Sequence, residues 1–445
     1  MATRSCLCIF TLLLVAFQST MMNANTVLPS PRCSPVLAST REMFQYALNL
    51  HIYKAVLFLG SSVGRKINDI SPDLVEGPAP IGVTLANLGN LPRRFIEESG
   101  LASVGHIRAI ADIESLRTPL PMPQLDIRPQ VFAKFFDVIN VTQNPPFNTY
   151  ANTNSFLFAA AYASYFLKQY YAGIIPSIVG NPEQELATEI ALYEAASYGV
   201  IRSLLNDREN LAVPLYTFTV GNVTNLTAQI GNQLGGCGVK DEGLTVPLAL
   251  GAENRTTNNV IPADVNSLSY KQTALEILRI VFITGNATKA ALSAIVNVTI
   301  LNPPLLRPLM DLRAEALAIV LGLTGAIAPA IVDNAEQQLL SEITRTNAAE
   351  LGVIRARLYA NFNATMPPYT LTVRNLTDII AEGVNLRGRC GVKEEGLVVP
   401  LQLGAENRTT VNVVPADVNS LAVSRTEPET LRILFGTRNA AIRGR

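Results

Sequence analysis

Hydrophobic residues recur at steps of three and four along four stretches of the chain, a spacing typical of helices that bury one face. The first two stretches are residues 41–66 and 91–117. Residues 152–179 are long, apolar and aromatic, and residues 183–208 follow Pro182, which stands where a helix can begin. The pattern therefore predicts four long helices.

The connections between these helices differ in length and composition. Residues 118–129 are a proline-rich break inside the long connection between the second and third predicted helices. Residues 236–268 are rich in Gly, Pro and Asn, which predicts an ordered but irregular tail, and we expect a short helix near 272–283. Four helices with one long crossover form a known kind of bundle. The expected fold is therefore all-α, a four-helix bundle with an irregular C-terminal extension.

Part of the chain occurs twice. Residues 237–268 recur with few changes as residues 390–421, at an offset of 153 positions, and the match extends to about residues 134–283 and 291–436. The repeated part covers the third and fourth predicted helices and the tail. A tandem duplication is the simple cause, and a misassembled gene model is the alternative. The sequence predicts one domain over 38–283 and a partial helical repeat over 291–436.

The partial repeat lacks the first two helices, so it cannot close a four-helix core alone. It must pack on the first bundle or pair with another chain, which would give a homo-oligomer through the C-terminal half-repeat. Residues 316–332 carry no charge over 17 positions, the lower edge of a membrane span. Their counterpart, residues 163–179, contains Lys168 and tyrosines and favours a buried bundle helix. We therefore expect no stable membrane span.

The N-terminus resembles a secretory signal. Arg4 precedes an apolar run over residues 6–17, which is too short to cross a bilayer, and small polar residues follow. This pattern predicts a signal peptide over residues 1–24, cleaved near Ala24, with an N-terminal anchor helix as the alternative. The mature protein is then secreted, to the extracellular space, the cell wall or the vacuole. Charges balance at 35 against 35, which argues against nucleic acid as a partner.

Sequons and cysteines agree with secretion. Three cysteines remain after removal of the signal, Cys33, Cys237 and Cys390, and they cannot pair completely. Which two of them pair stays open. Nine sequons of the Asn-x-Ser/Thr type predict a glycosylated surface, although Asn222 and Asn225 are too close for both to be modified. The nine are Asn140, Asn222, Asn225, Asn254, Asn286, Asn297, Asn363, Asn375 and Asn407.

Three polar residues lie on otherwise apolar helical stripes: His51, His106 and Glu194. An unpaired polar group in a core costs on the order of several kcal/mol, so these side chains should meet one another, a metal ion or water. In bundles that bind two metal ions, two helices each supply one Glu, and the other two each supply a Glu-x-x-His pair. The three residues are therefore candidate metal ligands.

Several motifs are similar to the plant desiccation-related proteins that carry a ferritin-like domain. The resemblance covers about residues 40–283, and its most specific part is the tail GVKDEGLTVPLALGAE (238–253). ALNLHIYKAVLF (47–58), VGHIRAI (104–110) and GVIRSLL (199–205) carry the rest. The resemblance implies a ferritin-like four-helix bundle and a role in the response to drying stress.

The chain departs from this family at the positions of the metal ligands. The family's first helix typically shows an LNLE-x-x-E pattern, and here those acidic positions are His51 and Lys54. The residue three before His106 is Ser103 rather than Glu, and the fourth helix keeps Glu194 but has Ser197 three residues later. One carboxylate therefore remains, with a lysine whose ammonium repels a metal ion.

Three functions are consistent with these residues. The interpretation we favour is a secreted, non-catalytic ferritin-like stress protein with a degenerate di-metal site and no cofactor. The first alternative is a mononuclear metal-binding or oxidative protein, in which His51, His106 and Glu194 hold iron or manganese. The second alternative is a structural or interaction protein of the cell surface that acts through the half-repeat. The sequence contains no serine-hydrolase, phosphate-loop or dinucleotide motif.

Overall fold

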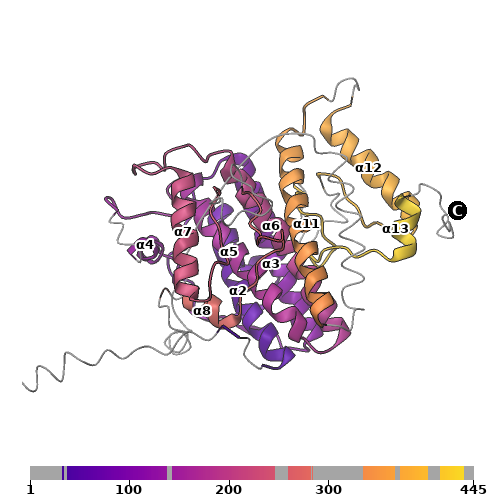
Figure 1. Cartoon of the computed structure of the whole chain (residues 1–445), viewed down its shortest axis with the longest axis horizontal. Helices are drawn as coiled ribbons and strands as arrows, with labels where there is room; N and C mark the ends of the chain where they lie inside the picture. Colours follow the sequence, from indigo (N-terminus) through magenta and orange to yellow (C-terminus); the bar gives the residue numbers. More distant parts are fainter. Residues whose placement is uncertain are drawn as a thin grey trace, which may run out of the picture. The chain divides into compact units, whose positions relative to one another are not determined.

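Four long helices form the centre of the structure, a computed structural model (Figure 1). They are α2 (Thr40–Ser62), α3 (Asn90–Ile113), α5 (Thr153–Ile174) and α6 (Asn181–Asn206). The structure describes residues 33–34, 38–137, 143–245, 259–281, 283, 334–365, 371–398 and 411–434, and these lie in one unit that begins at Cys33. The expected all-α fold is confirmed.

The helix ends follow from local sequence. Ser39 caps α2 by accepting a hydrogen bond from the backbone of Glu42, and the Glu42 side chain accepts one in return. The Asn152 side chain caps α5 by accepting one hydrogen bond from the backbone N–H of Ser155. Gly180, at a φ of 113°, precedes α6, and Pro182 lies in its first turn as the sequence predicted.

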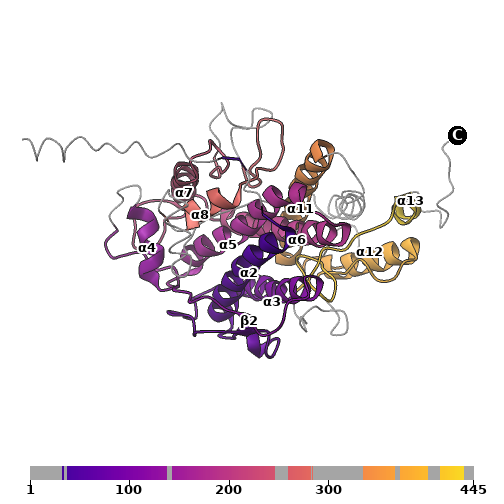
Figure 2. The same ribbon diagram turned by 90° about the horizontal axis from the view of Figure 1, so that it is seen from below.

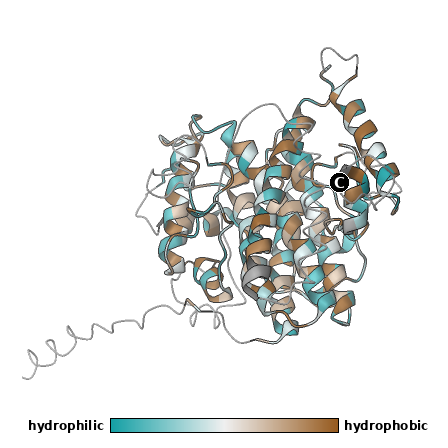
Figure 3. Ribbon diagram, turned by 45° about the vertical axis from the view of Figure 1, so that its right-hand side comes forward, coloured by the Kyte–Doolittle hydropathy of each residue, from teal (hydrophilic) through white to brown (hydrophobic). Residues whose placement is uncertain are grey.

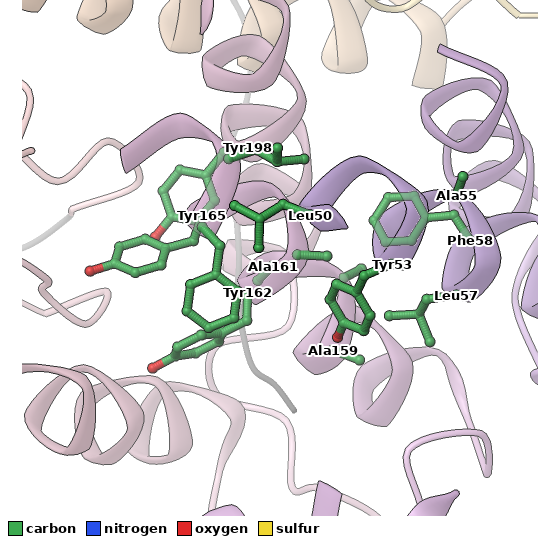
Figure 4. Close-up of a cluster of buried hydrophobic side chains, with 14 of the residues drawn as sticks. Leu50, Tyr53, Ala55, Leu57, Phe58, Ala159, Ala161, Tyr162, Tyr165 and Tyr198 are labelled. Carbon is green, nitrogen blue, oxygen red and sulfur yellow. The ribbon is translucent and has the colours of Figure 1, made fainter. Parts of the chain in front are cut away.

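The core lies between these four helices. Helix α2 packs against α3 and α5, and α5 packs against α6. Nearly every side chain of α5 is buried, and Tyr165 of α5 lies beside Tyr198 of α6 (Figure 4). Gly100 of α3 allows close approach to α2, because a Cβ atom there would lie 3.0 Å from the Leu59 side chain. Full burial of each large apolar side chain contributes about 1.5–3 kcal/mol.

Two helices of the first 283 residues were not predicted. Helix α4 (Pro129–Asp137) follows the proline-rich break and buries three phenylalanines, and α7 (Val220–Gly235) follows α6. Helix α8 (Ala274–Val281) is the short helix expected near 272–283. The long connections also form a two-stranded parallel pair, β1 (Val75–Glu76) with β2 (Leu120–Pro121).

The second copy of the repeated sequence contributes α11 (Asn334–Ala360), α12 (Val373–Gly388) and α13 (Glu427–Leu434). Helix α11 packs along α6, with α12 and α13 beyond it (Figure 2). The second copy therefore docks on the first bundle within one chain. Among the described residues no helix is long and apolar enough to cross a membrane, and the run 316–332 lies outside them. Hydrophobic and hydrophilic residues are mixed along the described helices (Figure 3).

A disulfide joins Cys33 to Cys237, which ties the start of the described chain to the segment after α7. Cys390 occupies the position equivalent to Cys237 in the second copy, since 390 − 237 = 153. It is exposed and forms no disulfide. The structure thus selects one pairing among the three that the sequence left open.

We predict that Cys33→Ser lowers the free energy of unfolding by about 2–4 kcal/mol, because the disulfide closes a long loop in the unfolded chain. Urea denaturation under non-reducing conditions measures the change. Cys390→Ser is the matched control and should change stability by less than about 0.5 kcal/mol. Equal losses from the two variants would contradict the assigned pairing.

Candidate functional site

Three helices bring His51, His106 and Glu194 together at the centre of the bundle. The side chains of all three are fully buried. Glu194 Oε1 lies 3.6 Å from His106 Nδ1 and 3.9 Å from His51 Nδ1. One ligand atom from each residue lies within 4.8 Å of the other two. We expected these three side chains to lie together, because they occupy apolar stripes of the first, second and fourth predicted helices.

Hydrogen bonds outside the centre orient both imidazole rings. His106 Nε2 lies 2.7 Å from the backbone oxygen of Ser420, which can only accept, so Nε2 donates its N–H. His106 Nδ1 of a neutral ring then carries a lone pair. His51 Nε2 lies 3.1 Å from the hydroxyl of Tyr171, and either group can be the donor. Burial, and after it the neighbouring His106 and Lys54, lower the pKa of His51 well below its ordinary value.

The inward-facing atoms of the cluster have no hydrogen-bond partner among the described residues. They are His51 Nδ1, His106 Nδ1 and Glu194 Oε1. The His106 lone pair faces a carboxylate oxygen, which is unfavourable unless a proton or a cation lies between them. These atoms are therefore suited to hold a single metal ion, since two imidazoles and one carboxylate are a known ligand set for iron.

Lys54 occupies the other side of Glu194. Its Nζ lies 2.5 Å from Glu194 Oε2 and 3.3 Å from Ser197 Oγ, and both charged side chains are fully buried. Nζ also lies 5.3 Å from the centre of the Phe58 ring. Burial lowers the pKa of Lys54, and the charge and hydrogen bond of Glu194 oppose this shift. The single carboxylate of the cluster is thus already paired with one cation.

Serine residues occupy positions at which bundles that bind two metal ions have carboxylate ligands. Ser197 accepts from Lys54 and lies 2.8 Å from Ser99 and 3.2 Å from Ser164. Ser103, three residues before His106, donates to the backbone oxygen of Ser99 in its own helix. Neutral hydroxyls cannot balance the charge of a metal ion. Among the described residues, Glu194 is the one carboxylate in the central cluster, so the residues present do not fit a pair of metal ions.

Four of the nine predicted glycosylation sites lie within the described residues. Asn222, Asn363 and Asn375 are exposed. Asn225 is half-buried, and its side chain packs against Gly243. The others, Asn140, Asn254, Asn286, Asn297 and Asn407, lie outside the described residues.

The helical fold and the buried cluster of His51, His106 and Glu194 define a ferritin-like bundle. Comparison with known proteins supports this class of protein. The family model for the ferritin-like domain matches residues 39–207. Ferritin-like catalase Nec2 of Nesocodon mauritianus is 35% identical over 247 residues, 55% of this chain and 78% of that protein. Desiccation-related protein PCC13-62 of Craterostigma plantagineum is 34% identical over 252 residues, 56% of this chain and 78% of that protein. No solved structure matches. The chain belongs to the desiccation-related family of ferritin-like proteins.

A second buried lysine lies outside the central cluster. Lys168 of α5 is 1% exposed, its Nζ has no hydrogen-bond partner among the described residues, and it lies 5.2 Å from the centre of the Tyr198 ring. Burial and, after it, the charge of Arg345 lower the pKa of Lys168 to about 7. The folded chain therefore releases this proton at a lower pH than the unfolded chain does.

The central ion pair gives a first prediction for this site. Lys54→Met leaves the Glu194 carboxylate buried and unpaired, so the free energy of unfolding should fall by about 3–5 kcal/mol. The double variant Lys54→Met/Glu194→Leu should recover most of that loss, because apolar side chains replace a buried pair at little cost. Urea denaturation of both variants measures this. The exposed pair Arg374–Asp378 is the control, and Arg374→Ala should cost less than about 1 kcal/mol. A loss from Lys54→Met no larger than the control would contradict a tightly paired carboxylate.

Lys168 gives a prediction on pH. Below about pH 7 both states hold the proton, and between about pH 7 and the ordinary lysine pKa of 10.5 only the unfolded state does. The contribution of Lys168 to the free energy of unfolding therefore rises with pH across that window. Lys168→Leu should remove the rise and stabilise the protein at pH 7 by about 1–3 kcal/mol, since it removes an unpartnered buried donor. Thermal melts at pH 7 and pH 9.5 measure both effects, and a variant with an unchanged pH slope would contradict the assignment.

Proposed function

We propose that this protein is a non-catalytic, secreted ferritin-like protein of drying stress, in which Lys54 has replaced a metal ion at the bundle centre. The contact that carries the proposal is the buried pair between Lys54 Nζ and Glu194 Oε2, at 2.5 Å. An ammonium held there neutralises the one carboxylate of the cluster. A divalent ion added beside it would leave two uncompensated positive charges in a buried core, which is costly.

The wider role rests on the relatives and on the sequence. One relative is named a desiccation-related protein, and this chain shares its family. The signal-like segment 1–24 and the sequons support secretion and glycosylation, and the signal-like segment lies outside the described residues. In the proposed role the protein acts through its surface in the cell wall, vacuole or extracellular space rather than through a reaction at its centre.

A second candidate function is binding of one metal ion with peroxide chemistry. The observation in its favour is the convergence of three buried, unpartnered atoms from His51, His106 and Glu194. One relative is named a ferritin-like catalase. In this alternative the three residues would hold one iron or manganese ion, which would supply redox chemistry. Ser420 would keep His106 oriented, and Lys54 would hold Glu194 in place.

One experiment separates the two functions. The protein is purified from its secreted form without chelator, its iron, manganese and zinc are measured, and oxygen release from hydrogen peroxide is followed. The proposal predicts less than about 0.1 equivalent of metal and no oxygen release above a metal-free blank, because a ligand set with a built-in cation binds weakly. About one equivalent of bound iron or manganese, with oxygen release, would establish the second candidate instead.

Lys54→Glu sharpens this experiment. It restores a carboxylate beside Glu194 and removes the ammonium, so we expect the variant to bind about one equivalent or more of metal under the same conditions. The exposed Lys66 provides the matched control, since Lys66→Glu makes the same change in net charge at the surface. Metal content in Lys54→Glu that stays equal to that of Lys66→Glu would contradict the role given to Lys54.

A further inference from the structure

Two nearly identical tail segments have different surroundings. Residues 259–268 (NVIPADVNSL) and 412–421 (NVVPADVNSL) make the same turn, since Ser267 and Ser420 have φ of 62° and 63°. The turn hydrogen bonds also agree, at 2.9 Å from Ser267 N to Asp264 O and 2.9 Å from Ser420 N to Asp417 O. Ser267 is nevertheless exposed, whereas Ser420 is fully buried. Local sequence sets the turn, and docking sets the burial.

The second-copy tail (residues 411–425) docks on α3. The carboxylate of Glu98 accepts hydrogen bonds from the backbone of Val413 at 3.1 Å and of Val414 at 2.8 Å. Seven residues further along the same helix, Gly105 leaves room for the turn, since a Cβ atom there would lie 2.7 Å from Asn419 O and 2.6 Å from Ser420 Oγ. Positions seven apart share one helix face. Apolar side chains of this tail belong to the main hydrophobic core: Val411, Val413, Val414 and Ala416.

The crossing of α6 and α11 brings this tail to the first bundle. A Cβ atom at Gly199 would clash with the backbone of Ala349, and one at Gly352 would clash with the backbone of Ala196. The two glycines are equivalent in the repeat, since 352 − 199 = 153, and so are the two alanines, since 349 − 196 = 153. The contact is therefore reciprocal, as in an isologous dimer interface. The second copy meets the first bundle as a partner subunit would.

We propose that Ser420 of the second copy is a positioning residue for the bundle centre. Its backbone oxygen accepts from His106 Nε2 at 2.7 Å, which holds the proton on Nε2 and leaves the Nδ1 lone pair directed at Glu194 Oε1, 3.6 Å away. The half-repeat thus completes the polar core of the first copy. This role goes beyond the proposed function.

The test is the tautomer of His106 in the full chain labelled with ¹⁵N-histidine, measured at one pH after chelator treatment. The chain has only two histidines, and a His51→Phe variant assigns their signals. We expect His106 to carry its proton on Nε2. Gly105→Ala should push the tail from α3, so the tautomer ratio should shift by about fivefold or more, the effect of losing one hydrogen bond. Glu98→Ala removes the carboxylate that accepts hydrogen bonds from the same tail. It is the second test variant if Gly105→Ala folds poorly.

The matched control is Gly100→Ala, the same substitution on the same helix. Its added methyl group meets Leu59 and Phe58 rather than the tail, so the His106 signal should stay unchanged. Faster hydrogen exchange at the Val413 and Val414 amides in Gly105→Ala and Glu98→Ala should accompany the tautomer shift. A proton on Nδ1 in the unaltered protein would overturn the proposal. So would a His106 signal that neither tail variant changes, or one that Gly100→Ala changes as much.

Discussion

The buried ion pair of Lys54 with Glu194 is the interaction on which the centre of this molecule depends. A carboxylate in a fully buried bundle needs a cation, and here a covalently attached ammonium supplies it at 2.5 Å. The pair removes the need for a metal ion as a structural counter-charge. It also explains why serines are tolerated around it, because Ser99, Ser164 and Ser197 satisfy one another and the ammonium.

The other half of the cluster keeps the features of a ligand site. Two imidazole nitrogens and one carboxylate oxygen face one another without partners among the described residues. The backbone oxygen of Ser420 orients His106 in the way that outer contacts orient histidines in metal sites. The centre therefore combines a paired side at Lys54 with a ligand-like side at His51 and His106. We propose that the charge of Lys54 outweighs the convergence of these three atoms.

Much of the fold could be predicted from the sequence, because strong periodicity marks helices buried on one face. The four long helices and His51, His106 and Glu194 follow from that pattern. Helix α7 could not be found this way, since Val220–Gly235 is rich in Gly, Thr and Asn, which are weak helix formers. Its signals were local ones, a Thr219 cap and Gly236 at a φ of 68°. The contact of Ser420 with His106 joins residues 314 positions apart, and no local pattern encodes it.

The central claim is that the Lys54 ammonium takes the place of a metal ion beside Glu194. Anomalous X-ray diffraction from crystals soaked in manganese or ferrous salt tests it most directly. The account predicts Lys54 Nζ within hydrogen-bond distance of Glu194 Oε2 and no anomalous peak among His51, His106 and Glu194. A peak beside Glu194 Oε1, or two peaks about 3.5–4 Å apart with Lys54 turned away from Glu194, would contradict it.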